Sequence, residues 1–138
     1  MEGSVILNTG PLVAYLDSHE EHHDWAVAQI ESFDDPMVTC EAVITEACFL
    51  LSHHKPALAK VADYLTRGLI RIEFSLAENH TAVFELMKKY HDVPMALADA
   101  CLVSMAEEVR GSRVFTVDSD FRVYRLRGRK AVPLICPD

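Results

Sequence analysis

The chain has 138 residues, half of them hydrophobic, and a formal net charge of −8. Its length predicts a single domain over residues 1–138 with a filled core, and no low-complexity tract indicates disorder. The acidic balance argues against a protein that coats nucleic acid, but it does not exclude a nuclease with clustered acids and a local basic strip.

The cysteines and the apolar runs indicate the compartment. None of the four cysteines is paired as CxxC, and each lies in or beside an apolar run: Cys40, Cys48, Cys101 and Cys136. Buried free thiols in a reducing cytosol are the simplest interpretation. The N-terminal MEGSVIL lacks a basic segment, and the longest apolar run is about half of the roughly 20 residues that a membrane span needs. We therefore expect a soluble, cytoplasmic protein without a membrane partner.

The first elements are a strand and two helices. Residues 5–7 predict the strand, and Thr9 is expected to cap the helix that follows, with Pro11 in its first turn. The stretch SHEE at residues 18–21 has the spacing of a capping box and predicts the start of a second helix, which DDP at residues 34–36 ends.

A strand, two helices and another strand are expected next. Residues 37–40 predict the strand and residues 41–51 a nearly all-apolar helix. Pro56 opens another helix, which ends near Gly68, and residues 69–74 predict a further short strand.

The last part continues the alternation. A capping box at residues 75–78 begins a helix that reaches about Tyr90, and residues 96–109 predict the next helix. Strands follow at residues 113–117 and 131–135. Because short apolar strands alternate with helices throughout, the pattern predicts an α/β fold of three layers, with a parallel sheet covered by helices on both faces.

Four acids and one amide are candidates for a functional site. Asn8 and Asp118 follow predicted strands, with Asp120 close behind, and sites in open parallel sheets form outside the carboxyl ends of strands. Glu46 and Asp99 interrupt apolar helices with no Lys or Arg within a turn. A carboxylate among apolar neighbours is costly unless it is paired or binds a metal.

Each acid also has a structural interpretation. Glu46 suits a thin solvent-facing strip of its helix, Asp99 an exposed position or a local cap, and VDSDF an Asx-rich turn. Taken together, these oxygen ligands suit Mg²⁺ or Mn²⁺, held by a few carboxylates, waters and a substrate phosphate. The chemistry that they imply is hydrolysis of a phosphodiester by a metal-activated water.

Four blocks resemble successive motifs of the PIN domain family, in particular its VapC-type toxins: ILNTGPLVAYLD, TEACFLL, PMALADACLVSMAEE and VFTVDSDFRVYR. They keep the family's order and span residues 5–125. The resemblance implies a parallel sheet of about five strands between helices and a Mg²⁺- or Mn²⁺-dependent ribonuclease. Many such proteins are toxins that pair with a small antitoxin and form homodimers.

The resemblance assigns roles to particular residues. Glu46, Asp99 and Asp118 match three of the family's metal-site acids, Asp120 matches a further acid, and Thr116 matches a frequent hydroxyl. No Ser–His or Cys–His nucleophile lies in the matching blocks, so water is the expected nucleophile.

Asn8 departs from the family, which has its first acid at this position. An amide oxygen can coordinate a hard cation but brings no charge, so we expect about a 10²- to 10³-fold slower reaction. Ala96 is a second departure, since relatives often have Asp there. Three possibilities stay open: a slow nuclease, a relative that binds RNA or a partner without cutting, or a change introduced to quiet a toxic enzyme.

Two further patterns bear on function. HEEHH at residues 19–23 matches the zinc motif H-E-x-x-H, with both histidines one helical turn apart, but it follows a capping Ser18 and lacks a third ligand. We interpret it as an exposed helix start. Seven of the thirteen Lys and Arg gather late in the chain: Arg110, Arg113, Arg122, Arg125, Arg127, Arg129 and Lys130.

These late basic residues surround the Asp118 turn, where they could hold a phosphate backbone. Arg122 and Arg125, together with Thr116, are the first candidates for RNA binding, and a solvated surface or the acids of a protein partner is the alternative. We predict a Mg²⁺- or Mn²⁺-dependent endoribonuclease, the toxin of a toxin–antitoxin pair. The rivals are a catalytically weak module that binds RNA or protein, and a structural subunit of an RNA-processing assembly. Apolar helices near residues 41–67 favour a homodimer.

Overall fold

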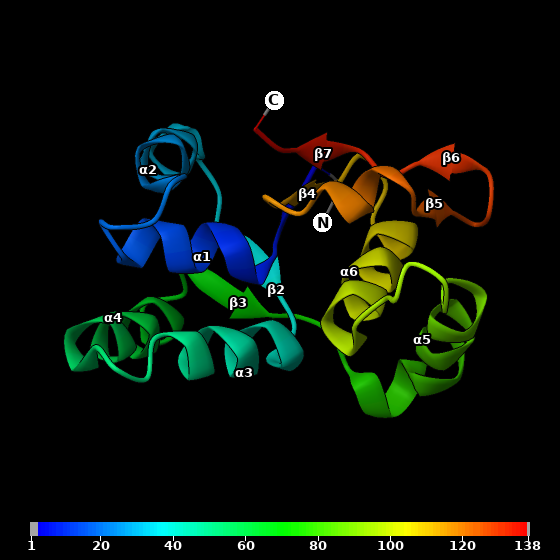
Figure 1. Ribbon diagram of the computed structural model, residues 1–138, viewed down its shortest axis with the longest axis horizontal. Helices are drawn as coiled ribbons and strands as arrows, with labels where there is room; N and C mark the ends of the chain where they lie inside the picture. Colours follow the sequence, from blue (N-terminus) through cyan, green and yellow to red (C-terminus); the bar gives the residue numbers. More distant parts are fainter. Residues whose placement is uncertain (1–2, 138) are drawn as a thin grey trace.

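Five parallel strands form one sheet in the order β3–β2–β1–β4–β7 in the computed structural model, which describes residues 3–137 (Figure 1). Ile6 in the central strand lies opposite Val38 on one side and Val114 on the other. The strands are β1 (Val5–Leu7), β2 (Met37–Thr39), β3 (Ile70–Ile72), β4 (Arg113–Phe115) and β7 (Leu134–Ile135). The predicted parallel sheet of about five strands is confirmed.

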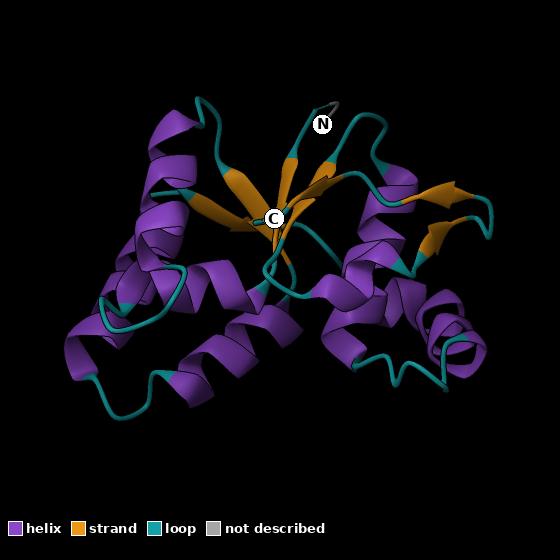
Figure 2. Ribbon diagram, turned by 45° about the horizontal axis from the view of Figure 1, so that its top comes forward, coloured by secondary structure: helices purple, strands orange, loops and turns teal. Residues whose placement is uncertain are grey.

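Helices cover both faces of this sheet and make three layers (Figure 2). The described helices are α1 (Thr9–Leu16), α2 (His23–Ser32), α3 (Glu41–Leu50), α4 (Lys55–Thr66), α5 (Leu76–Lys89), α6 (Leu97–Glu108) and the short 3-10 helix η1 (Ser119–Arg122).

Strand side chains alternate between two cores. Ile6 and Val114 pack into the core on the side of α5 and α6. Leu7 and Phe115 point to the opposite core, against α1, α2 and α4. Because successive strand residues face opposite ways and both faces are covered, the strands are apolar without interruption, as their sequences indicate.

Two predicted helix starts are wrong. The cap of α1 is Asn8, whose side chain accepts from the backbone N–H of Thr9. The helix α2 begins at His23, not at Ser18, because the Asp17 carboxylate accepts from the backbone N–H of His19 at 2.9 Å and turns the chain there. His19 therefore lies in a turn, and the helical spacing assumed for the two histidines does not exist.

An antiparallel hairpin of β5 (Arg125–Leu126) and β6 (Lys130–Ala131) was not predicted. Its loop, residues 127–129, contains a turn with Arg127 and Gly128 at φ values of 50° and 72°, and the N–H of Arg129 donates to Leu126 O at 3.0 Å. Loops of this kind usually carry Asn-Gly or Asp-Gly, so Arg-Gly is a weak signal. The last strand is shorter than predicted because Ala131 belongs to β6.

The structure bears on the expectations for membrane spans and for the cysteines. Within residues 3–137, we find no helix with both the length and the hydrophobicity that crossing a bilayer requires. All four cysteines are free, as expected, but only Cys40 and Cys101 are buried, and Cys48 and Cys136 are partly exposed.

Gly10, in the first turn of α1, is required by its contact with Val117. A Cβ at Gly10 would collide with Cγ2 of Val117, the residue before Asp118. We expect Gly10→Ala to destabilise the chain by about 1–3 kcal/mol, because overpacking outweighs the roughly 0.5–1 kcal/mol that Ala gains over Gly in a helix. Urea unfolding measures this effect. Adding Val117→Ala should recover most of the loss, and no recovery would contradict the contact.

Candidate active site

Asn8 joins the carboxyl ends of two neighbouring strands. It follows β1, is 5% exposed, and accepts from the N–H of Thr9 at 2.7 Å through Oδ1. Its Nδ2 donates to Thr116 Oγ1 at 2.9 Å, and Thr116 follows the adjacent strand β4. Both ends of the amide are thus held, and the oxygen is held at the edge of the sheet where sites form.

The hydrogen bonds continue from Thr116 into the acidic turn. Thr116 Oγ1 accepts from the N–H of Asp118 at 3.0 Å, and Asp118 Oδ1 accepts from the N–H of Asp120 at 2.9 Å. Asp118 is the cap of η1, so the segment is an Asx turn, as the structural interpretation of VDSDF predicts. The turn orients the Asp118 carboxylate on a backbone that Thr116 and Asn8 hold in place.

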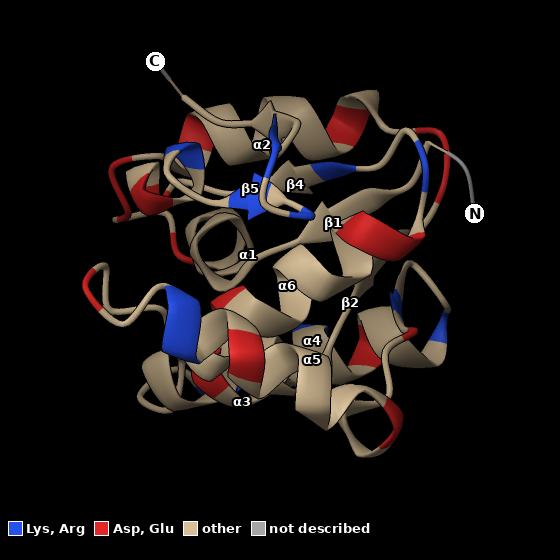
Figure 3. Ribbon diagram, turned by 90° about the vertical axis from the view of Figure 1, so that its right-hand side faces the viewer, with Lys and Arg blue, Asp and Glu red and all other residues tan. Residues whose placement is uncertain are grey.

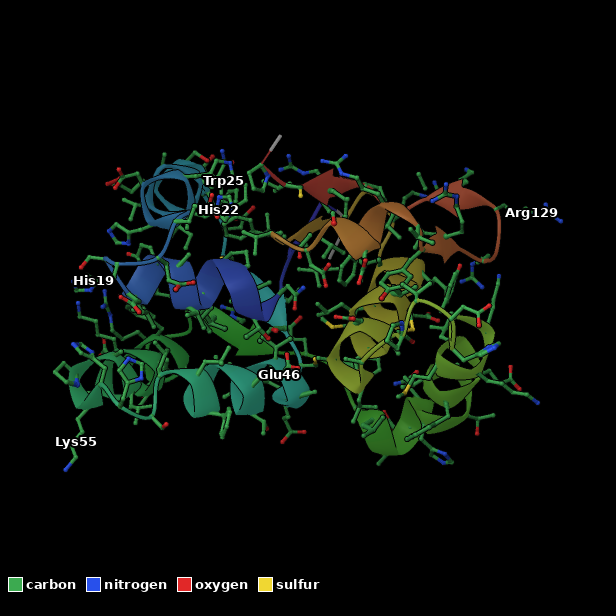
Figure 4. All side chains as sticks on the ribbon, viewed as in Figure 1. His19, His22, Trp25, Glu46, Lys55 and Arg129 are labelled. Carbon is green, nitrogen blue, oxygen red and sulfur yellow. The ribbon has the colours of Figure 1, made fainter. Side chains whose placement is uncertain are left out.

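Glu46 reaches the same place from α3. It is solvent-exposed, and Figure 4 shows it on α3 near the middle of the molecule. Its Oε1 accepts from Thr9 Oγ1 at 2.6 Å, and Thr9 is bonded to Asn8. Thr9 was expected only as a helix cap. No sequence signal distinguishes a threonine that caps from one that holds a distant carboxylate.

Asp99 is the third residue of α6 and is half-buried. Its Oδ2 accepts from the N–H of Ala96 and from the hydroxyl of Tyr124, both at 3.3 Å. The local-cap interpretation therefore holds for this acid. Tyr124 is fully buried, and sequence analysis missed its contact because nothing in the mixed stretch FRVYRLR distinguishes a tyrosine that bonds a distant carboxylate from one that only packs in the core.

The acids are close enough to affect one another's charge. The pKa of Asp99 is raised to about 6, chiefly by burial and then by the charges of Asp118 and Glu46, against the opposing effect of the Ala96 N–H and Tyr124. No ion pair between described residues includes Glu46, Asp99, Asp118 or Asp120. The site thus holds concentrated negative charge that no basic residue in the described part of the chain pairs with.

This charge predicts an unusual pH dependence for the chain without divalent cations. The folded state holds the Asp99 proton up to about pH 6 and the unfolded state only to about pH 3.8. The contribution of Asp99 to stability is therefore complete below about pH 4 and is lost as the pH rises through 6. We expect urea unfolding in EDTA to show that the stability of Asp99→Asn relative to the parent chain rises as the pH increases between these values. A constant difference would contradict the raised pKa.

The donors suit a hard divalent cation in kind. They are oxygens only, from carboxylates and one amide, which Mg²⁺ and Mn²⁺ prefer. Within residues 3–137, no three His, Cys, Asp or Glu side chains already stand at ligating distance from a common point. Mg²⁺ commonly uses one or two carboxylates and keeps several waters, so a closed cage is not required.

The two arginines nearest the acidic turn differ in their freedom. Arg122 is exposed at the end of η1. Arg125 is partly buried, and its guanidinium donates to the carbonyls of Arg122, Val123 and Tyr124 at 2.7–3.3 Å. Arg122 is therefore free to meet a ligand, whereas Arg125 also stabilises the turn after η1.

Comparison with known proteins bears on the family and the fold of the chain. The sequence pattern of the PIN domain matches residues 5–126. The chain is 29% identical over 118 residues to ribonuclease VapC26 of Mycobacterium tuberculosis, covering 83% of this chain and 86% of that protein. The crystal structure of Mycobacterium tuberculosis VapC20, described as a sarcin-ricin loop cleaving toxin, superimposes with a TM-score of 0.74. That similarity covers 87% of this chain and 94% of VapC20 at 21% identity, so it bears on the fold alone.

Proposed function

Because the chain belongs to the PIN domain family, we propose that it is a metal-dependent endoribonuclease and the toxin of a toxin–antitoxin pair. One observation carries the proposal. Asn8, Glu46, Asp99 and Asp118 come from four separate parts of the chain and converge at one edge of the sheet, through hydrogen bonds or mutual charge. We extend the domain to the whole chain, residues 1–138.

Each residue has a proposed role. Glu46, Asp99 and Asp118 hold Mg²⁺ or Mn²⁺, Asn8 adds a neutral oxygen, and Asp120 assists from the same turn. Thr116 holds Asn8 and the Asp118 backbone in register. A bound cation supplies charge neutralisation at the scissile phosphate and lowers the pKa of the attacking water. Arg122 and Arg125 contact the RNA near the acidic turn, whereas Thr116, which is fully buried, acts on the RNA only through the residues that it positions.

Cleavage of a structured RNA tests this proposal. We expect cleavage with Mn²⁺ or Mg²⁺, none with EDTA, and at least a 10²-fold loss in Asp118→Asn, because the variant removes one charge from the cation site. Asp34→Asn, an exposed acid before β2, is the matched control and should cut as the parent does. Cleavage that survives EDTA or Asp118→Asn would reject this active site.

Asn8 favours a second candidate, a module that binds RNA or a protein partner without cutting. The amide lowers the charge available to a cation by one unit, and it is already engaged at both ends. Retained RNA binding without cleavage, in every divalent cation tried, would support this candidate over the first.

Three partner and location statements belong to the same proposal. The partners are RNA and a small antitoxin, and the chain works in the cytoplasm, which its four free thiols support. A homodimer is supported by Phe49 and Leu50 on α3, which are 77% and 50% exposed. We expect Phe49→Ser with Leu50→Ser to shift the chain to a monomer in sedimentation, because a dimer interface needs an apolar centre. An unchanged mass would reject this face.

A further inference from the structure

Six of the seven basic residues late in the sequence lie in two groups in space. Arg122 and Arg125 lie beside the acidic turn, whereas Arg110, Arg129 and Lys130 line a separate groove of about 740 Å³ at the β5–β6 hairpin. Arg127 also lines it, and Glu107 is the acid among the lining residues. Figure 3, seen from the side of α5 and α6, shows several of the basic segments close together at and beside β5.

The groove has a rigid wall. The loop that carries Arg127 is closed by the Arg129 N–H bond to Leu126 O, with two residues at positive φ. Arg127 also anchors the hairpin to the last turn of α6, since its backbone N–H donates to Glu107 Oε2 at 2.6 Å and its guanidinium to Glu107 O at 3.2 Å. A non-glycine residue at positive φ is costly, so these contacts hold the hairpin in one geometry.

The other three basic side chains have no such role. Arg110, Arg129 and Lys130 are exposed, and none is in an ion pair with another residue of the described chain. In a chain with a net charge of −8, this groove is a local positive field beside an acidic site. We propose that it binds the RNA backbone several nucleotides from the scissile phosphate, which rests on the proposed function.

The spacing fits one RNA strand. Asp99 and Glu107 lie eight residues apart on α6, or about 12 Å at 1.5 Å per residue. The segment from Tyr124, bonded to Asp99, to Arg127, bonded to Glu107, runs along the same helix. At about 3.4 Å per nucleotide of a stacked strand, the groove lies about four nucleotides from the site.

The lining favours RNA over an acidic protein. Its apolar members include Leu126, Val109 and Pro133, and the lining contains no aromatic residue or methionine. Protein interfaces usually have a buried centre of aromatic, methionine and arginine anchors, of which this lining supplies arginines alone, whereas phosphate binding needs exposed basic groups on a firm support.

Salt-dependent RNA binding in EDTA tests the groove without any cleavage. The probe is a labelled single-stranded RNA of about 12 nucleotides, followed by anisotropy between 50 and 200 mM salt. The variant combines Arg110→Gln, Arg129→Gln and Lys130→Gln and leaves Arg127 in place. The slope of log K against log salt is negative, and losing three phosphate contacts should make it less steep by about 2. Across this range the parent should therefore lose about 20-fold more affinity than the groove variant.

A matched variant removes three exposed charges elsewhere, through Lys55→Gln, Lys60→Gln and Arg71→Gln. Figure 4 shows Lys55 and Arg129 at opposite ends of the molecule. We expect the parent slope for this control. Three outcomes would overturn the proposal that the groove binds RNA. They are equal slopes for the parent and the groove variant, an equal loss of slope in both triple variants, and no RNA binding by the parent. Unchanged RNA binding with lost binding of a poly-glutamate peptide would also overturn it and would assign the groove to a protein.

Cleavage with Mn²⁺ separates this inference from the proposed function. If no RNA is cut, but the dependence of RNA affinity on salt is weakened in the groove variant and not in the control, the nuclease proposal fails and the groove proposal stands. If RNA is cut and the slopes are equal, the groove fails and the nuclease stands. If both hold, RNAs shorter than about four nucleotides should be cut equally by the parent and the groove variant, because they do not reach the hairpin.

Discussion

Asn8→Asp is expected to raise Mn²⁺-dependent RNA cleavage about 10²- to 10³-fold, equivalent to roughly 3–4 kcal/mol of transition-state stabilisation. The added charge strengthens the hold on a divalent cation beside Asp99 and Asp118. The surroundings accept the change, because one carboxylate oxygen still caps the Thr9 N–H. Thr116 can turn its hydroxyl to donate where it now accepts from Asn8, and it still accepts from the N–H of Asp118.

Ser75→Asp is the matched control for this variant. Ser75 caps α5 through the N–H of Glu78, so the change also adds one carboxylate at a helix cap. Ser75 lines a cavity together with Glu108, which is at the end of α6 opposite to Asp99, so the change should leave the rate unchanged. If Asn8→Asp cuts no faster than an active parent, the amide is sufficient at this position. If neither cuts, the residue at position 8 is not what limits the chain.

Asp99→Asn should have the opposite effect, with cleavage falling about 10³-fold while the cation-free chain becomes more stable. The amide keeps an oxygen for the Ala96 N–H or the Tyr124 hydroxyl, so the fold is preserved. The change removes the carboxylate whose pKa is raised by burial, Asp118 and Glu46, and with it a negative charge that has no ion-pair partner among the described residues. Lost activity combined with gained stability is the mark of a residue kept for function.

Cleavage rates and thermal unfolding with and without Mn²⁺ check this pair of effects, in the parent and in the Asn8→Asp background. Mn²⁺ should raise the melting temperature of the parent and have little effect on Asp99→Asn. Glu108→Gln, an exposed acid on the same helix, is the control and should behave as the parent. An Asp99→Asn chain that is both active and stabilised by Mn²⁺ would remove Asp99 from the cation site.

Much of the fold could be predicted because its signals are local. Short apolar strands that alternate with helices require a sheet covered on both faces, and the described strands and helices follow that order. The errors lie where the same local residues are compatible with more than one backbone structure. At residues 17–23 the Asp17 carboxylate makes a turn although the residues of a capping box are present. At residues 125–131 the backbone angles of Arg127 make a hairpin that Arg-Gly hardly indicates.

For the candidate site, sequence alone determined which side chains are unusual: an amide and an aspartate after apolar strands, and two acids inside apolar helices. Only the tertiary structure decided what they share, because a contact across the sheet depends on strand order, and strand order is set by packing of the whole core. It alone brings Thr9 to Glu46 and Tyr124 to Asp99, pairs 37 and 25 residues apart. It also separates basic residues that are near one another in sequence. The hairpin places Arg129 and Lys130 near the end of α6, away from Arg122.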